Sequence, residues 1–280
     1  MLDVWLGLHV ETKTGNNGAC LSRHTTNCCK NNSCSHRWQA YRTALAHPGK
    51  YKTPTALVKH KKKKYRPIPD ERNKKVVSPK AWDLEEVSMV YRRPKGSKGA
   101  DSELLTVKNF RERADVPYPR NAHHIIPNSV LNKALYSAGK ESTDLFLLTR
   151  ISLLQAKYNL NYKSNLILLP IDRVIAKAMG LPRHISGKDA DSTDNRETQN
   201  HSTYNDEVYK VVSKIVRNFA RQISKVNHDI ELKKLGKAKL ERYSKKVMTR
   251  LFEWGGGGKG AALNKAPKRI FEHKVYNTGI

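Results

Sequence analysis

Acidic residues are scarce in this chain. Its 280 residues include 25 Asp and Glu against 53 Lys and Arg, which gives a formal net charge of +28. A positive field of this size attracts polyanions, so nucleic acid is the favoured partner, ahead of an anionic membrane or an acidic protein. Hydrophobic residues make up 38%, which is enough for a core and argues against complete disorder.

Long apolar runs are also missing. No stretch reaches the roughly 18 apolar residues that a membrane span needs, so we expect no transmembrane helix. Residues 1–10 lack the basic and apolar parts of a secretory signal. If the protein leaves the cell that makes it, we expect a route that does not depend on a signal peptide.

Cysteine is confined to the first part of the chain. The cysteines, with two histidines interleaved, are Cys20, His24, Cys28, Cys29, Cys34 and His36. Thiolates and imidazoles are the ligands of small structural zinc sites, although no paired C-x-x-C spacing is present here. Disulfides or free thiols are therefore the alternatives to a structural zinc ion.

The charge and apolar patterns divide the chain into three parts. Residues 1–100 form a Cys-rich, basic and irregular region, and its segment 67–98 is expected to be a linker with little structure. Within it lies a basic block that is typical of phosphate-contacting segments, namely Lys61, Lys62, Lys63, Lys64 and Arg66. Residues 101–255 are expected to form the main domain, and residues 256–280, which begin within a run of four glycines at 255–258, a basic flexible tail.

The main domain is expected to be α+β and mainly helical. Strands are predicted at 104–107 and 166–170, and the second of these is apolar throughout. The leucine-rich helix at 143–158 is expected to lie in the core, and a later helix shows an apolar stripe at helical spacing. The predicted helices span 38–46, 128–138, 143–158, 171–179, 203–226 and 238–254.

Two adjacent histidines, His123 and His124, form the centre of the only stretch that looks selected for chemistry. On a strand their side chains would point to opposite faces, whereas a turn or bulge could bring both to one site. In either arrangement one imidazole can bind a metal ion while the other transfers a proton. Hydrolysis of a phosphodiester needs such a pair, together with a group that orients the base.

The later polar residues Asn165, His184 and His201 follow this pair in order. The segments that carry the pattern are Ala122–Pro127, Asn165–Pro170, Leu181–His184 and His201–Asn205. Together they resemble the AHH family of nucleases, which belongs to the HNH/endonuclease VII superfamily. That resemblance implies a small ββα-metal (HNH-like) core within the helical domain.

The resemblance also implies residue roles. It makes His123, His184 and His201 ligands of a divalent metal ion (Mg, Ni or Zn), His124 the general base, and Asn165 the residue that holds the loop of the base. The chain departs from the family in one respect, since His201 lies 17 residues after His184, with the polar segment 187–200 between them. Asp189, Asp191 or Asp194 is therefore an alternative source of a ligand.

Family members are commonly toxins of bacterial competition. The resemblance therefore implies an endonuclease that cuts DNA with little sequence preference, and the same fold could instead cleave RNA. It further implies an acidic immunity protein, a secretion-system carrier, synthesis in a bacterial cytoplasm and action in the cytoplasm of a target cell. A basic nucleic-acid-binding protein without enzymatic activity is the alternative from another class.

Overall fold

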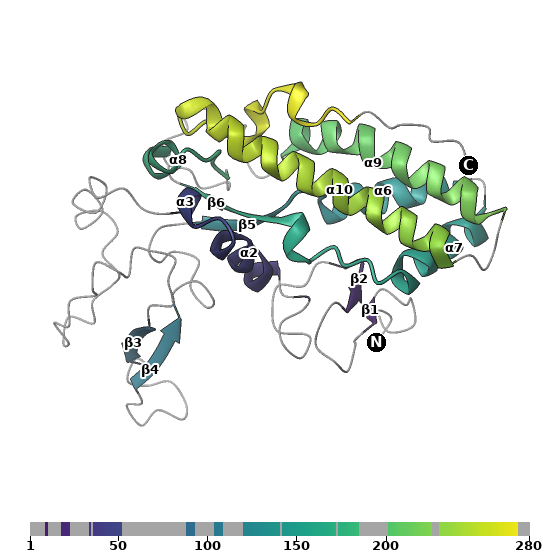
Figure 1. Ribbon diagram of the computed structural model, residues 1–280, viewed down its shortest axis with the longest axis horizontal. Helices are drawn as coiled ribbons and strands as arrows, with labels where there is room; N and C mark the ends of the chain where they lie inside the picture. Colours follow the sequence, from purple (N-terminus) through teal and green to yellow (C-terminus); the bar gives the residue numbers. More distant parts are fainter. Residues whose placement is uncertain are drawn as a thin grey trace.

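The computed structural model describes residues 9–10, 18–22, 34, 36–51, 88–92, 104–108, 120–140, 142–171, 173–184, 201–225 and 230–273. Helices predominate and the strands pair in small antiparallel sheets, which confirms an α+β chain that is mainly helical (Figure 1). Within these residues, none of the helices combines the length and hydrophobicity needed to cross a bilayer.

Each described strand pairs with one other. The pairs are β1 (His9–Val10) with β2 (Ala19–Cys20), β3 (Ser88–Arg92) with β4 (Leu104–Lys108), and β5 (Arg120–His124) with β6 (Leu166–Pro170). The strand predicted at 104–107 is confirmed. Within the segment 67–98, which we expected to have little structure, residues 88–92 form strand β3 and pair with β4; the other residues of this segment lie outside the described part of the chain.

The pair β5–β6 brings together segments that are distant in sequence. Helices α6 (Asn128–Ala138) and α7 (Thr143–Gln155) and the 3-10 turn η3 (Lys163–Asn165) are inserted between the two strands. Every residue of β6 is buried, as expected for an apolar strand that ends in proline. Helix α8 (Arg173–Met179) follows directly and ends at Gly180, whose φ of +60° suits glycine.

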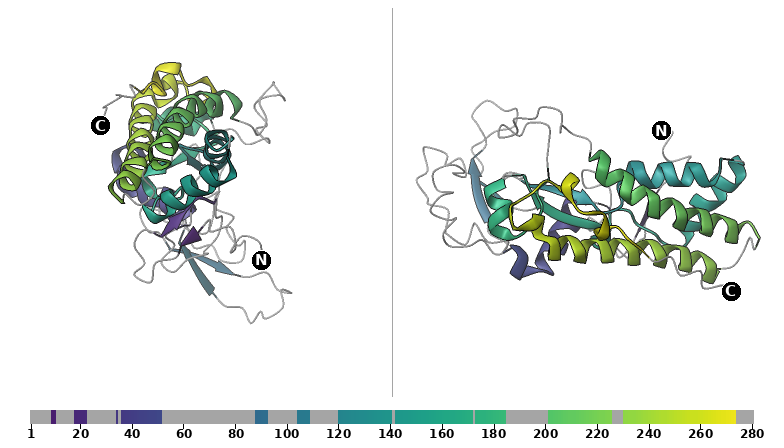
Figure 2. Two further views of the ribbon diagram at one scale, coloured as in Figure 1. Left: turned by 90° about the vertical axis from the view of Figure 1, so that its right-hand side faces the viewer. Right: turned by 90° about the horizontal axis from the view of Figure 1, so that it is seen from above.

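Two long helices cover one side of the β5–β6 pair, which we call the β5–β6 hairpin although two helices lie between its strands in sequence. Helix α9 (Ser202–Ile223) and helix α10 (Ile230–Trp254) run beside each other and pack with α6 and α7 (Figures 1 and 2). The predicted apolar stripe of α9 is buried at Val208, Val212, Ile215, Val216, Phe219 and Ile223. Helix α10 begins eight residues earlier than predicted, because packing against α9 outweighs the low helix propensity of Gly236.

Helix α7 is only partly a core helix. Leu153 and Leu154 are buried, but Leu147 and Ile151 are 38% and 48% exposed. The prediction that the whole leucine-rich segment 143–158 lies in the core was therefore wrong for one face. Leucine content alone does not show which side of a helix meets a neighbour.

The described N-terminal residues share the main core. Helices α2 (His36–Leu45) and α3 (Pro48–Tyr51) pack against the hairpin, and the Tyr51 hydroxyl donates to the carbonyl of Leu168 at 2.9 Å. Ala19 and Leu21 belong to the same apolar cluster. This arrangement differs from the division at residue 100, because residues before the division supply part of the core that buries β6.

Residues 255–273 are also packed, which corrects the expectation of a flexible tail from residue 256. They form the turns η4 (Gly255–Gly258), η5 (Leu263–Lys265) and η6 (Lys268–Ile270), and Leu263 and Phe271 are buried. The four glycines of η4 have φ values from 54° to 68°. A Cβ atom at Gly255 would lie 2.6 Å from the Gly180 carbonyl oxygen, so glycine permits a tight turn rather than a loose linker.

The close crossing of α9 and α10 gives a stability test. A Cβ atom at Gly236 would lie 2.5 Å from the ring of Phe219, which is only 3% exposed and cannot move aside easily. Gly236→Ala should therefore destabilise the protein by about 1–3 kcal/mol, although alanine favours helix. Urea unfolding monitored by circular dichroism measures this loss.

Gly49→Ala is the matched control. Gly49 lies in α3, and a Cβ atom there would have nothing within 4 Å. The substitution should leave the stability unchanged or raise it by up to about 1 kcal/mol. Equal unfolding midpoints for the two variants would contradict the close packing at Phe219.

Candidate active site

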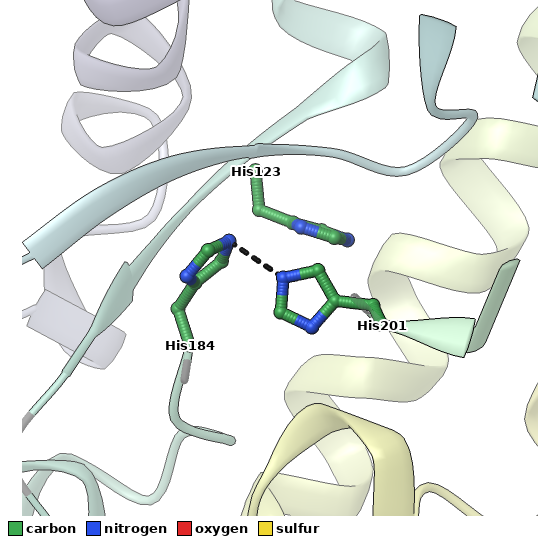
Figure 3. A group of neighbouring side chains, drawn as sticks. All are labelled: His123, His184 and His201. Atoms are coloured by element: carbon green, nitrogen blue, oxygen red, sulfur yellow. Dashed lines mark hydrogen bonds between the residues drawn. The ribbon is translucent and has the colours of Figure 1, made fainter. Parts of the chain in front are cut away.

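Three imidazoles from separate segments meet at the side of β5 that faces α9. His123 lies on β5, His184 follows α8, and His201 immediately precedes α9. One ring nitrogen from each lies within 4.8 Å of the others, and Figure 3 shows the three rings turned toward a common space. Despite the 17 residues that separate His184 from His201, the fold places these two side chains next to each other.

The closest contact in this cluster joins His184 and His201. Their Nε2 atoms are 3.0 Å apart, as the dashed line in Figure 3 shows. Two imidazole lone pairs cannot face each other at this distance unless a proton or a metal ion lies between them. Metal–nitrogen bonds of about 2.0–2.1 Å in a tetrahedral site put the nitrogens about 3.3 Å apart. The residues present therefore fit a metal ion that His imidazoles ligate.

Main-chain hydrogen bonds of His184 and of the preceding Arg183 determine the position of His184. Its amide donates to the carbonyl of Pro170, the last residue of β6, at 2.8 Å. The neighbouring Arg183 donates to the carbonyl of Ala261 and accepts from the amide of Leu263. The C-terminal turns thus fix the segment that carries His184, while Asn121 on β5 lies 3.3 Å from its Nδ1 atom.

His201 is the N-cap residue of α9, so the helix begins at Ser202, one residue before the predicted start at 203. The His201 carbonyl accepts from the amide of Asn205 at 2.7 Å, but the imidazole forms no cap hydrogen bond. The ring is directed instead toward His123 and His184. Burial lowers the pKa of His201, which keeps the ring neutral near pH 7 and its lone pair available to a metal ion.

Tyr204 supports the cluster from the first turn of α9. Its ring packs edge-on against His123, with the ring centres 4.9 Å apart, and its hydroxyl donates to the carbonyl of Ile125 at 2.8 Å. It therefore fixes both His123 and the chain directly after β5. We predicted no role for Tyr204 from the sequence, although its place three residues after His201 is the spacing of one helical turn.

His124 points to the other face of β5, as alternation along a strand requires. Its Nε2 atom lies 2.9 Å from Oδ1 of Asn161, and its ring stacks on His36 at the start of α2. His124 is 7% exposed. Asn161 and His36 are contacts of His124 that the sequence analysis did not assign.

Asn165 connects the start of β6 with the chain that leaves β5. Its side chain accepts from the amide of Ile126 at 2.8 Å and donates to the carbonyls of Ile126 and Leu160. Its Oδ1 atom also accepts from the Ser244 hydroxyl of α10 at 2.9 Å. This position, next to the two histidines, is compatible with the role that the family resemblance implies for Asn165.

The comparison with family models matches residues 107–238 to AHH, a nuclease family of the HNH/ENDO VII superfamily with conserved AHH. The match contains Ala122, His123 and His124 and all the later residues of the proposed site. This segment belongs to the AHH family. No curated protein and no solved structure matched the chain.

The AHH domain, residues 107–238, is therefore a nuclease domain. Its substrate class is nucleic acid. Residues from three described segments outside it, 18–22, 36–51 and 239–273, nevertheless pack on the strands and turns that carry its histidines. The site as a whole is thus built from more of the chain than the family match spans.

Several sequence-based predictions have a partial answer or lie outside the described residues. Cys20 and Cys34 are buried and lie in one cluster, where the amide group of Asn161 is directed at the sulfur of Cys20 and that of Asn159 at the sulfur of Cys34. Structural zinc at this place stays a prediction. The candidate site residues that lie outside the described part of the chain are His24, Cys28, Cys29, Lys61, Lys62, Lys63, Lys64, Arg66, Asp189, Asp191 and Asp194.

The Asn165 contacts predict a large loss of stability when its side chain is removed. Asn165→Ala would leave buried groups of Ile126, Leu160 and Ser244 without these hydrogen bonds, at a cost of about 2–4 kcal/mol. Thermal unfolding should show a clear decrease in Tm.

Asn132→Ala serves as the control for this variant. Asn132 is exposed and donates to the side chain of Asn128, so its loss should change stability by less than about 0.5 kcal/mol. A Tm for Asn165→Ala as high as that of Asn132→Ala would mean that Asn165 does not hold the chain after β5.

Proposed function

We propose that the protein is a metal-dependent endonuclease that hydrolyses phosphodiester bonds of DNA with little sequence preference. The AHH domain indicates nuclease activity. The observation that carries the finer proposal is the cluster of His123, His184 and His201 beside His124, because a metal site and a basic group are what phosphodiester hydrolysis needs.

The ligand types favour a transition metal ion. Imidazoles suit Zn²⁺, Ni²⁺ and Co²⁺ better than Mg²⁺, which prefers oxygen ligands and keeps several waters. When bound by the three histidines, such an ion supplies charge stabilisation to the scissile phosphate and the leaving oxygen. In this proposal Zn²⁺ or Ni²⁺ supports activity at lower concentrations than Mg²⁺.

His124 is the proposed general base. It accepts a proton from the water that attacks phosphorus, while Asn165 holds the chain directly after it. His123 and His124 are consecutive and leave β5 on opposite faces, so we expect the scissile phosphate at the end of β5, where both faces are within reach. The ββα-metal core of this proposal consists of β5, β6 and α8.

The surrounding charge supports binding through the phosphate backbone. A net charge of +28 favours contacts with phosphates, which carry no sequence information. We propose DNA as the substrate. RNA is the alternative, because among the described residues we identify no group that would distinguish the two by recognising a 2′-hydroxyl. Lys61, Lys62, Lys63, Lys64 and Arg66 are the proposed phosphate contacts outside the described part of the chain.

We further propose that this nuclease is an antibacterial toxin. It would be exported by a carrier of a secretion system and act in the cytoplasm of a target cell. The producing cell then needs an inhibitor, and the positive charge favours an acidic immunity protein that covers the site or the basic surface. Support for this biological role comes from the family resemblance and the charge.

Plasmid nicking tests the enzymatic proposal. Protein treated with EDTA should not nick supercoiled DNA, and separate addition of Zn²⁺, Ni²⁺, Mn²⁺ and Mg²⁺ shows which ion restores activity. His124→Ala should lower the rate by about 10²–10⁴-fold, the usual contribution of a general base, while one metal equivalent stays bound. His47→Ala is the control, because His47 is exposed and its described side-chain contacts are with the carbonyl of Thr43 and the ring of Phe252, which lie outside the proposed site.

The outcomes separate the parts of this proposal. Nicking that persists in EDTA would exclude the metal, and full activity of His124→Ala would place the base elsewhere. If none of these ions supports cleavage of DNA or RNA, the result would favour the alternative that the chain is a basic nucleic-acid-binding protein without enzymatic activity.

Salt dependence tests the proposed mode of binding. If about six or more phosphates are contacted, affinity for duplex DNA should fall by about 10³-fold or more between 50 and 200 mM salt. Fluorescence anisotropy with the His124→Ala variant measures this without cleavage, on two duplexes of unrelated sequence. A flat salt response, or a large difference between the duplexes, would contradict recognition through the backbone.

A further inference from the structure

We propose that Asn161 is the positioning residue of His124, and that it holds the imidazole in the tautomer with the proton on Nε2. We also propose that the N-terminal segment Ala19–Ser22, outside the AHH match, holds Asn161 in place. This inference rests on the proposed function, because it takes His124 as the base. It assigns a structural contribution to catalysis that the family match does not include.

The hydrogen bonds of Asn161 define its orientation. Its side chain is completely buried. The amide nitrogen Nδ2 donates to the carbonyl of Ser22 at 2.7 Å and lies 3.5 Å from Sγ of Cys20. On the other side, Oδ1 lies 2.9 Å from Nε2 of His124.

This arrangement determines the proton on His124. A main-chain carbonyl only accepts, so the NH₂ group of Asn161 must face Ser22. The carboxamide oxygen then faces His124, and Nε2 must carry the hydrogen that it donates. With the opposite orientation of the amide, two oxygens would meet at 2.7 Å in a buried place, at the cost of a lost hydrogen bond. In the resulting tautomer Nδ1 has the lone pair that can accept a proton.

An acceptor on Nε2–H contributes in two ways to a histidine base. It fixes the direction of the ring and determines which nitrogen is basic, as the third residue of a catalytic triad does for the histidine of that triad. It also stabilises the charged ring that forms when Nδ1 takes up the proton. The buried position of Asn161 excludes water as a competing partner and keeps this contact short.

The N-terminal strand holds the segment that carries Asn161. The amide of Cys20 donates to the carbonyl of Tyr158 at 2.9 Å, and the amide of Leu160 donates to the carbonyl of Cys20 at 2.7 Å. The amide of Asn161 is fixed in turn by Oδ1 of Asn159 at 2.9 Å. With the bond from Asn161 to Ser22, these contacts join residues 158–161 to a strand that precedes the AHH domain.

Substitution of Asn161 separates positioning from stability. Asn161→Leu removes the acceptor with little change in volume, and we expect kcat to fall about 10–100-fold, as for other groups that orient a functional histidine. KM and the bound metal should stay unchanged. Asn161→Asp retains an oxygen that accepts from Nε2–H, so it should recover most of the lost kcat even if its Tm is lower.

Thr43→Val is the matched structural control. The Thr43 hydroxyl is buried and donates to the carbonyl of Lys163 at 2.7 Å, a bond that links α2 to η3 without contact to His124. This variant should lose stability and retain its kcat. Equal effects of Asn161→Leu and Thr43→Val on kcat, at matched fractions of folded protein, would overturn the positioning role.

Nitrogen NMR of the full chain tests the tautomer without any change at Asn161. In protein labelled with ¹⁵N at histidine, the His124 signals are those that His124→Ala removes. The wild-type ring in its neutral state should show a protonated Nε2 and a bare Nδ1, and Asn161→Leu should shift it toward a mixture. A protonated Nδ1 in the wild type would overturn the inference even if Asn161→Leu did not fold.

The assignment of His124 as the base and the role of Asn161 can be contradicted separately. If His124→Ala cleaves DNA as fast as the wild type, the base assignment fails, and the role of Asn161 fails with it. If His124→Ala is inactive but Asn161→Leu has the wild-type kcat, the proposed function stands and only the inference on Asn161 is overturned.

Discussion

The antiparallel pairing of β5 with β6 is the constraint on which the rest of the site depends. His123 pairs with Ile167 and His124 with Leu166, so the two histidines occupy the last paired positions of β5. Because successive side chains of a strand alternate, one imidazole joins His184 and His201 while the other reaches Asn161. A shift of the register by one residue would turn the side chains of His123 and His124 to the opposite faces of β5. It would break up both the histidine cluster and the contact with Asn161.

This register is held by side chains at the end of the hairpin as well as by the strands. Asn165 bonds across to Ile126, and Tyr204 bonds to the neighbouring carbonyl of Ile125. Two further segments, from opposite ends of the chain, complete the support. Residues Ala19–Ser22 fix the side of His124, and residues Ala261–Leu263 fix the side of His184. These contacts explain why the site needs parts of the chain on both sides of the AHH domain.

Local features of this architecture could be predicted from the sequence, because they depend on neighbouring residues. The apolar stripe of α9 and the all-apolar strand β6 are repeated patterns that identify an element and its buried face. The double histidine and the later Asn165, His184 and His201 could be recognised as a pattern from the residue types and their order. Among these features, the contact between His184 and His201 was the hardest to predict from the sequence. It depends on how α8 and α9 are placed in the fold, not on the spacing of the two residues along the chain.

What the sequence did not reveal are contacts between distant segments. Asn161 lies in a polar turn, where an asparagine needs no further explanation, and its partner Ser22 is far away along the chain. Four consecutive glycines and a basic composition are typical of a loose tail, but burial of Leu263 and Phe271 against the core outweighs this tendency.

The all-imidazole composition of the cluster determines the charge of the proposed metal site. Within the described residues, its candidate ligands include no carboxylate. A divalent ion held by neutral rings keeps its full positive charge. In the proposed enzyme the substrate phosphate is then the group that neutralises the ion, so the metal and the DNA should strengthen each other's binding, in a protein whose positive charge already favours the approach of a polyanion.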